Sequence, residues 1–512
     1  MIIKELVYTV GNKLNKLLQH LLICCLLPTA YSLLLYAYPL GWSDDILLTP
    51  EDDMQRSNPD LDVDTYNNVW AVWDSGTWVN NTAEILYSKR DSLGDSLIPE
   101  TNISSNVPYS HLPRVAVDAS NNIQFIWREA SSQGLGIGHT KLANDGTVIV
   151  SSHLAVSGAG GGSSSLRPEM VLNKYNEINI IWDESPSGYN QMNYTKLDTL
   201  GNPIIAKIRV SLENIYVYWP GIGVDSFANN HMAYRSDSGF QDRLTYTKLD
   251  KDGNILIDNK ILDTGLLPTI IADRSQNIHM VYPHPTGSGW SIEYLKLSNN
   301  GSILIFPKTI SIHERNMSPH MAMDSLQYLH VVWPAESSGV FPIMYTKLDT
   351  LGNFIIPPMQ VVYPPYTVRG GGMPRIAIDP SNKLHLVWVD DRLNPLVSTD
   401  IYYKRGENEN TVEETALLKT ANLTRISVFP NPFSKATKIS FGKEQSAEGI
   451  ELKIYDVSGR LVRQWDYPTI RQSDHIIWDG TDDSGNHLPA GVYFIHFSNC
   501  PNVKSIPVVT TK

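Results

Sequence analysis

Cysteine is scarce in this sequence, with three residues in 512. Cys24 and Cys25 are adjacent in an apolar N-terminal segment, and Cys500 lies near the other end of the chain. If that segment is removed, one thiol remains and an internal disulfide is excluded. The chain must then draw its stability from strand pairing and apolar burial, which favours a large closed architecture.

Charged residues are also few, at 18% of the chain. The 53 acidic and 41 basic residues give a formal net charge of −12. No basic run could follow a phosphate backbone, which argues against nucleic-acid binding. The 12 tryptophans and 25 tyrosines accompany 34 glycines and 31 prolines. This balance is typical of aromatic-rich strands joined by tight turns, so the predicted fold class is all-β.

The N-terminus has the features of an export signal. Lys13 and Lys16 precede an apolar run over residues 17–35, and small residues such as Ala30 follow its centre. We therefore predict a cleavable signal peptide over residues 1–38 and a secreted or cell-surface protein. A retained membrane anchor is the alternative, because the apolar run approaches the length of a spanning helix.

The middle of the chain repeats with a period near fifty residues, which is typical of propellers and related arrays. Each repeat has a polar residue at the end of a short strand, and nine positions further on an aromatic residue. The polar residues are Asp64, Asp118, Asn173, Asp225, Asp273, Asp324 and Asp379. The aromatic residues are Trp73, Trp127, Trp182, Tyr234, Tyr282, Trp333 and Trp388.

A second repeated feature is a strand resembling Tyr-Thr-Lys-Leu-Asp. We place its start at Tyr87, His139, Tyr194, Tyr246, Tyr294, Tyr345 and Tyr402. In the first six repeats a glycine follows seven residues later, where a hairpin needs a residue tolerant of positive φ. Each repeat therefore reads as four short strands, which make one propeller blade. The last repeat supplies strands over 375–379, 384–389 and 401–404, and 354–357 is an example of an outer strand.

Alternation within the second strand predicts how neighbouring blades pack. Leu384, Leu386 and Trp388 share one face, while His385 and Val387 take the other. We expect the tryptophan face to pack against a neighbouring blade.

The last repeat lacks an outer strand, and Asp45 to Pro50 resembles the missing piece. Pairing of this segment with the last blade would close the ring and remove two sheet edges. We therefore predict a seven-bladed β-propeller over residues 43–406, with the Gly- and Ser-rich runs 158–165 and 370–372 as surface loops.

Candidate catalytic residues are few. Arg114 and Arg375 lie in Pro-Arg-hydrophobic settings that resemble the arginine motif of sialidases, and residues 74–78 resemble a sialidase Asp-box. The equivalent repeat position holds Glu169 and His320 in other units, which favours a structural role for the arginines. No nucleotide loop, zincin helix or nucleophile elbow is present in the sequence.

Four histidines stand three residues before the aromatic landmark: His231, His279, His330 and His385. They could ligate a metal across adjacent blades, but regular repetition favours hydrogen-bonded structural histidines. The repeated aspartates precede Asn-rich turns, where side-chain capping of the turn explains them better than calcium. We predict no catalytic, cofactor-binding or metal-binding residue, and no cofactor.

Residues 407–424 turn polar and read as a linker, and a new pattern occupies residues 425–512. Its motifs are Val428-Phe429-Pro430-Asn431-Pro432-Phe433, Leu452 to Val462 with Tyr455-Asp456-Val457-Ser458-Gly459-Arg460, Trp478-Asp479-Gly480, and Leu488-Pro489-Ala490-Gly491-Val492-Tyr493-Phe494. They resemble the C-terminal sorting domain of type IX secretion substrates and also a hook-capping-type Ig-like module. Both resemblances imply a small β-sandwich, and the sorting-domain resemblance implies export across the outer membrane.

Together these patterns predict an exported, non-catalytic surface protein. The propeller would act as a binding or adhesion scaffold for an unknown protein or glycan, and the C-terminal domain would engage the secretion machinery or attach the chain to the cell surface. Membrane contact is expected only through the signal or that attachment. A sialidase-like glycoside hydrolase is the alternative, and a purely structural module of an envelope assembly is a third possibility.

Overall fold

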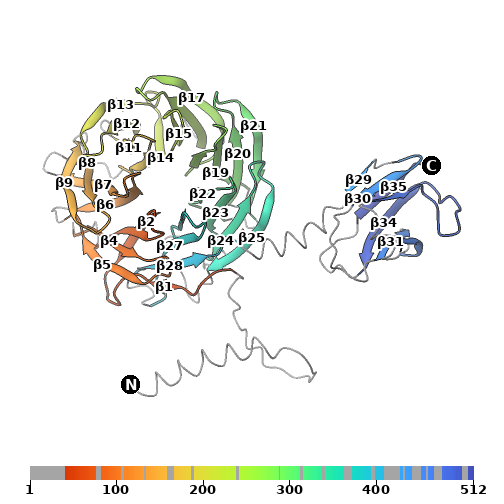
Figure 1. Ribbon diagram of the computed structural model, residues 1–512. Coiled ribbons are helices and arrows are strands. Elements are labelled where there is room, and N and C mark those ends of the chain that lie inside the picture. The colour runs from red at the N-terminus through yellow and green to blue at the C-terminus, as the bar shows by residue number, and fades with distance from the viewer. Residues whose placement is uncertain are drawn as a thin grey trace, which may run out of the picture. The chain divides into compact units, whose positions relative to one another are not determined.

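A computed structural model gives the fold of the chain (Figure 1). It describes residues 41–76, 82–104, 109–131, 134–157, 166–185, 189–237, 242–287, 289–311, 315–336, 341–362, 372–393 and 398–408 of the propeller, and residues 427–429, 433–440, 451–456, 459–465, 475–498 and 506–511 of the C-terminal domain. Among these residues no helix has the length and apolar character needed to cross a membrane. The predicted signal peptide, the run 158–165 and most of the predicted linker lie outside them.

The described part of residues 41–408 forms seven four-stranded antiparallel sheets, and Figure 1 shows them arranged as blades around one axis. Blade 1 contains β2 (Arg56–Val63), β3 (Val69–Ser75), β4 (Glu84–Arg90) and β5 (Ser96–Asn102). Blade 2 contains β6 (Ser110–Val117), β7 (Ile123–Ser131), β8 (Gly134–Leu142) and β9 (Val148–Val156). Blade 3 contains β10 (Glu169–Leu172), β11 (Ile178–Glu184), β12 (Gln191–Leu197) and β13 (Pro203–Arg209).

The other blades follow the same order. Blade 4 contains β14 (Tyr216–Val224), β15 (Asn230–Asp237), β16 (Asp242–Leu249) and β17 (Ile255–Thr264). Blade 5 contains β18 (Thr269–Ala272), β19 (Ile278–Pro285), β20 (Trp290–Leu297) and β21 (Ile303–Thr309). Blade 6 contains β22 (His320–Met323), β23 (Leu329–Pro334), β24 (Ile343–Leu348) and β25 (Phe354–Val362). Blade 7 contains β26 (Arg375–Ile378), β27 (Leu384–Asp390), β28 (Asp400–Gly406) and β1 (Ile46–Leu47).

The N-terminal strand β1 completes blade 7, which is the pairing expected from the sequence. Ile46 pairs with Tyr403, and the amide of Leu48 donates to the carbonyl of Ile401 over 2.9 Å. Asp45 forms ion pairs with Arg392 (2.6 Å) and Lys404 (2.8 Å). Because this last sheet contains both ends of the propeller chain, the ring closes by hydrogen bonds and charge pairs.

The aromatic landmarks fill the space between blades. Trp388 of blade 7 packs in one buried cluster with Val332 and Tyr345 of blade 6, and Trp127 of blade 2 packs with Tyr87 of blade 1. These side chains are almost completely buried. Each tryptophan therefore packs against the preceding blade, as the period-two pattern predicted.

The two faces of the propeller differ in their connections. On one face, here the turn face, the first and second strands and the third and fourth strands are joined by short turns of constant length. Gly94, for example, has φ +93° and donates its amide to the carbonyl of Asp91, closing the turn that the sequence predicted there. On the other face, here the loop face, the connections differ in length from blade to blade. Binding residues concentrate on variable connections of this kind.

The register of the last repeat corrects one prediction. Tyr402 lies opposite Trp388, whereas Tyr403 lies opposite Val387 and bonds to His385. Tyr403 is therefore the equivalent of Tyr345 in blade 6, and the repeated strand begins one residue later than we expected. Two adjacent tyrosines on opposite faces of β28 made the sequence ambiguous, and pairing with β27 decides between them.

The boundary of the propeller is also later than residue 406. The amide of Glu407 donates to the carbonyl of Gly41, and Asn408 accepts from Lys347 and donates to Asp324. Asn299 makes equivalent bonds to Asp225 and Lys248 from the hairpin of a following blade. Residues 407 and 408 therefore belong to the propeller, where Asn408 replaces the hairpin that blade 7 lacks.

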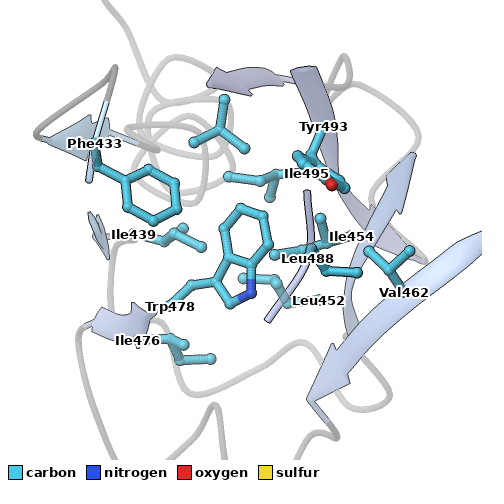
Figure 2. Close-up of a cluster of buried hydrophobic side chains, with 11 residues drawn as sticks. Phe433, Ile439, Leu452, Ile454, Val462, Ile476, Trp478, Leu488, Tyr493 and Ile495 are labelled. Carbon is cyan, nitrogen blue, oxygen red and sulfur yellow. The ribbon is translucent and has the colours of Figure 1, made fainter. Parts of the chain in front are cut away.

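The C-terminal domain is a sandwich of two sheets. One contains β29 (Ser427–Phe429), β30 (Thr437–Ser440) and β33 (His475–Trp478); the other contains β31 (Glu451–Asp456), β32 (Leu461–Trp465), β34 (Gly491–Ser498) and β35 (Ile506–Thr510). Figure 2 shows Trp478 at the centre of its core, near Phe433, Leu452 and Tyr493. Phe433 and Tyr493 lie with ring centroids 5.4 and 5.5 Å from that of Trp478. The sequence motifs thus supply the core of an Ig-like domain.

Candidate functional site

The innermost strands of the seven blades begin at the loop face, and each has a proline at or near its beginning. We call the residues before these prolines the rim residues and the residues after them the floor residues. The rim residues are Asn58, Leu112, Arg167, Trp219, Leu267, Ser318 and Met373. The floor residues are Asp60, Arg114, Glu169, Gly221, Thr269, His320 and Arg375.

The rim residues and four of the floor residues, Arg114, Glu169, Thr269 and Arg375, surround a cavity at the mouth of the central channel. This mouth cavity has a volume of about 490 Å³ and is lined by all seven rim residues. Its lining includes apolar side chains such as Trp219, Phe341 and Met317, and four arginines. It adjoins a second cavity of about 280 Å³ inside the channel, which Glu169 and Arg375 also line. The mouth therefore has a partly apolar rim above a charged floor.

The backbone turns the rim residues toward the cavity. Every rim residue except Arg167 has a positive φ, between +41° and +57°. In blades 1, 2 and 4 the ladder shifts register at this point, which is the pattern of a β-bulge. A bulge re-aims a side chain at the end of a strand, and in these three blades it places the residue before the proline at the channel mouth.

Two arginines of the floor share one carboxylate. Arg114 donates from Nε and Nη2 to the two oxygens of Glu169, over 2.8 and 2.5 Å. Arg375 donates from Nη2 to Glu169 over 3.4 Å, and its Nε lies 4.0 Å from a carboxylate oxygen of Asp60. The bidentate geometry fixes the planes of both partners. Glu169 thus lies between guanidinium groups of blades 2 and 7.

The pKa values of the two floor carboxyls, Asp60 and Glu169, are shifted in opposite directions. Burial opposes ionisation of Glu169, but the charges of Arg114 and Arg375 outweigh it and lower its pKa to about 2. Burial raises the pKa of Asp60 above its ordinary value, an effect that Arg375 and Arg114 only partly offset. Asp60 also accepts the amide of Val115 from the next blade over 3.1 Å.

Other floor residues bond to the strand of the next blade. The hydroxyl of Thr269 donates to the carbonyl of Pro319 over 2.8 Å, and Nδ1 of His320 accepts the amide of Ile376 over 3.2 Å. Burial, with the nearby charge of Arg375, lowers the pKa of His320 to about 3. The imidazole is therefore neutral at physiological pH and carries its proton on Nε2 as a donor.

Gly221 is the one floor position without a side chain. A Cβ there would lie 2.2 Å from the carbonyl oxygen of Pro268, a distance that no real contact adopts. The inner strands of blades 4 and 5 approach each other closely at this point, and only glycine permits that approach.

The residues that resemble an Asp-box lie partly at this site. Asp74 is buried and accepts the amide of Leu112 over 3.0 Å and the side chains of Ser57 and Asn58. His111 lies 3.2 Å from the same carboxylate. Asp74 therefore holds the rim residues Asn58 of blade 1 and Leu112 of blade 2 by hydrogen bonds. The last two residues of the Asp-box-like segment, 77 and 78, lie outside the described residues.

The four repeated histidines lie inside their blades, away from the channel. Each bonds through Nε2 to the aspartate that ends the first strand and through Nδ1 to a tyrosine hydroxyl of the third strand. The triads are Asp225–His231–Tyr246, Asp273–His279–Tyr294, Asp324–His330–Tyr345 and Asp379–His385–Tyr403. The same aspartates cap their turns, as Asp225 does for Phe227 and Asn229. The hydrogen-bonded role predicted for these histidines is the one the structure shows.

The described residues contain no group of three or more His, Cys, Asp or Glu side chains arranged to hold a metal ion.

Asp62 is a titratable group at the other end of the channel, in a cavity lined by turn-face residues. Burial raises its pKa to about 6, although the amides of Val117 and Val63 donate to it. A group with a raised folded-state pKa stabilises the fold below its ordinary value of 3.8, and this contribution is lost as the pH rises through 6.

Asparagine keeps one of the two acceptor oxygens, so Asp62→Asn loses one of these hydrogen bonds at any pH. We therefore expect the stability of Asp62→Asn relative to the wild type to be about 1 to 2 kcal/mol more favourable at pH 8 than at pH 4. Thermal unfolding at the two pH values measures the difference. Asp95→Asn, at an exposed position of an outer turn, is the control that should show no gain at either pH. An equal effect of Asp62→Asn on stability at both pH values would contradict the assignment.

Sequence reasoning singled out four of the floor residues and missed the others. Arg114, Glu169, His320 and Arg375 were compared as equivalents, and the structure brings them to one mouth. Asp60, Trp219 and the remaining rim residues were not recognised. The proline that recurs in every repeat, from Pro59 to Pro374, was the signal that could have found them.

Comparison with known families concerns the C-terminal domain. Residues 429–499 match the FlgD Ig-like domain. This match supports the hook-capping-type Ig-like resemblance and leaves the propeller uncovered. Among curated proteins, none matches the chain in sequence.

Solved structures similar to the chain include three carbohydrate-active proteins. An ulvan lyase, a polysaccharide lyase, is 8% identical, with a TM-score of 0.46 over 70% of this chain and 95% of its own. A Hadza microbial sialidase is 10% identical, with a TM-score of 0.43 over 70% of this chain and 66% of its own. An α-L-arabinanase from Penicillium chrysogenum is 11% identical, with a TM-score of 0.43 over 60% of this chain and 98% of its own. At such identities residue roles do not transfer between chains.

Proposed function

We propose that the propeller is a non-catalytic binding module that takes its ligand at the channel mouth on the loop face. The observation that carries this proposal is the mouth cavity of about 490 Å³, with an apolar rim and a floor of fixed charges. Its volume and mixed lining are those of small-ligand sites, and it lies among the variable connections of the fold.

Two groups of the floor suit the holding of a ligand. Glu169 is kept ionised by two guanidinium groups, and His320 is kept neutral with its Nδ1 occupied by a backbone amide. The charged groups of the floor are thus engaged by other protein groups before any ligand arrives. Preorganised donors of this kind give orientation and specificity.

Arrays of glycans and peptides probed with the full chain should identify a ligand, and calorimetry then gives its affinity. Arg375→Ala removes a half-buried donor that lines the mouth cavity and is expected to weaken binding roughly tenfold or more. Arg274→Ala, on the turn face, is the matched control and should bind as the wild type does. Equal affinity of the wild type and Arg375→Ala would place the ligand elsewhere.

A carbohydrate-active enzyme is the second candidate, and one observation favours it. Asp60 and Glu169 lie around Arg375 with pKa values shifted in opposite directions, as in an acid and base pair. A panel of fluorogenic glycosides and polysaccharides tests this directly. If the wild type turns over one of these substrates and both Glu169→Gln and Asp60→Asn abolish the turnover, the propeller is an enzyme and the proposed binding function is wrong.

We further propose that the C-terminal domain directs export or surface attachment through the secretion machinery, after removal of residues 1–38. Support comes from the separate Ig-like domain and from the sorting-domain motifs in its sequence. Deleting residues 425–512 should retain the propeller inside the producing cell, measured by fractionation and by the mass of the released protein. Normal release of the deleted chain would contradict this role.

A further inference from the structure

Four aromatic side chains form a continuous track from blades 3 and 4 to the mouth cavity. Tyr189 lies with its ring centroid 5.0 Å from that of Tyr216, Tyr216 lies 6.3 Å from Tyr218, and Tyr218 lies 5.9 Å from Trp219. Tyr189 and Tyr216 are exposed, at 44% and 41%, and Trp219 lines the mouth cavity. We call these four residues the aromatic track.

The strand β14 builds most of this track. Tyr216 and Tyr218 are two residues apart, so the strand places them on one face, and their rings are stacked with planes 5° apart. The register of β14 and β15 then shifts between Tyr218 and Gly221, and Trp219 has a φ of +54°. A bulky residue in this conformation is strained, and strain of this kind concentrates at binding sites. The bulge brings Trp219 into line with the tyrosines.

Arginines accompany the track and the mouth. Arg235 lies over Tyr218 and Trp219, with its guanidinium carbon 5.2 and 5.3 Å from their ring centroids. Arg167 lies 5.9 Å from the ring of Trp219. Arg114, Arg167, Arg315 and Arg375 line the mouth cavity against one carboxylate, that of Glu169, in a chain whose net charge is −12.

Two of the mouth arginines form ion pairs in which the arginine is much the more exposed partner: Arg167 with Asp183, and Arg315 with Glu336. The side chain of Arg167 is 36% exposed and that of Asp183 beneath it is 0% exposed. The side chain of Arg315 is 62% exposed and that of Glu336 is 28% exposed. A ligand that approaches the rim there therefore meets cations before their counter-charges, which favours an anionic ligand.

The geometry points to an acidic polysaccharide as the ligand, bound along the aromatic track with one end in the mouth cavity. Sugar rings present faces of C–H groups that stack on aromatic rings, and successive aromatic rings suit a ligand of successive rings. Carboxylates on the sugars would pair with the arginines at the mouth. This inference rests on the proposed binding function and names its ligand class.

Affinity electrophoresis and calorimetry of the full chain test the inference with three polymers: polygalacturonate, neutral galactan, and polyglutamate, which carries carboxylates but no sugar rings. We expect polygalacturonate to bind at least tenfold more tightly than either of the others. Tyr216→Ala and Tyr218→Ala should each weaken its binding roughly threefold to tenfold. Tyr66→Ala removes a tyrosine of the turn face that is 70% exposed, and should leave binding unchanged.

The outcomes separate this inference from the function on which it rests. Binding that is weakened by Arg375→Ala but unchanged by both track variants would overturn the track and leave the mouth as the binding site. If galactan binds as tightly as polygalacturonate, the inference that the ligand is acidic is wrong. If polyglutamate binds as tightly as polygalacturonate, the inference that the ligand is a polysaccharide is wrong. If the array and all three polymers show no binding to the folded wild type, the proposed function itself fails.

Discussion

Deletion of residues 43–52 is expected to lower the thermal unfolding temperature of the propeller by roughly 10 °C or more. The deletion removes β1, exposes the edge of β28, and takes away Asp45, the partner of Arg392 and Lys404. It also removes Leu48, which is buried in the cluster between blades 7 and 1. Together these losses amount to several kcal/mol, because an opened ring also lets its two end blades separate.

The measurement is thermal unfolding of the deleted chain, followed by near-UV circular dichroism. Asp44→Ala, an exposed substitution in the same segment, is the control and should unfold with the wild type. Leu48→Ala should fall between the two, with a loss of about 2 to 3 kcal/mol. Unfolding of the deleted chain at the wild-type temperature would show that β1 does not close the ring.

Asp225→Ala is expected to cost about 3 to 5 kcal/mol of the free energy of unfolding. The carboxylate is buried, caps its turn through the amides of Phe227 and Asn229, and accepts from His231 over 3.2 Å and from Asn299 over 2.9 Å. Removing it leaves the imidazole and the amide of Asn299 without this partner. A buried donor that loses its acceptor pays its full desolvation cost.

Asp250→Ala in the same blade is the matched control. Asp250 caps an outer turn through the amides of Asp252 and Asn254 in the same geometry, but these hydrogen bonds are at the surface and no histidine bonds to it in the described residues. Its replacement should cost about 1 kcal/mol or less. Chemical denaturation of the two variants measures the difference, and equal losses would show that the histidine contributes nothing.

Acid should narrow the difference in the free energy of unfolding between the wild type and Asp225→Ala. Burial opposes ionisation of Asp225, but hydrogen bonds from His231 and Asn229 outweigh it and hold the pKa of the carboxyl well below 3.8. A lowered pKa stabilises the fold above 3.8, and that contribution is lost as the pH falls below it. The wild type therefore loses stability in acid that Asp225→Ala has already lost.

The repeat made most of the propeller predictable. The polar and aromatic residues nine positions apart located the end of each first strand and the second strand that follows it, and glycines such as Gly94 located the hairpins, because each has one local physical cause. The closing strand followed from the missing fourth strand of blade 7. The register of Tyr402 and Tyr403 did not follow, since it depends on pairing across the variable connection between β27 and β28.

The site was less predictable because it forms between repeats. Arg114 and Arg375 are far apart in sequence and meet only when the ring closes on Glu169. The sequence around each arginine gives no information about its distance from the other arginine or from Glu169 in the fold. Trp219 joins the tyrosines of β14 through a bulge, and an extra residue in a strand breaks the alternation by which the sequence assigned faces.

Hydrogen exchange of the full chain, with and without a ligand found on the arrays, tests the central claim most directly. The claim predicts that protection on binding falls on peptides at the start of the inner strands, from Pro59 to Pro374, and on the beginning of β14, while the ligand is recovered intact. Protection confined to the turn face or the outer strands, or recovery of a cleaved ligand, would contradict it.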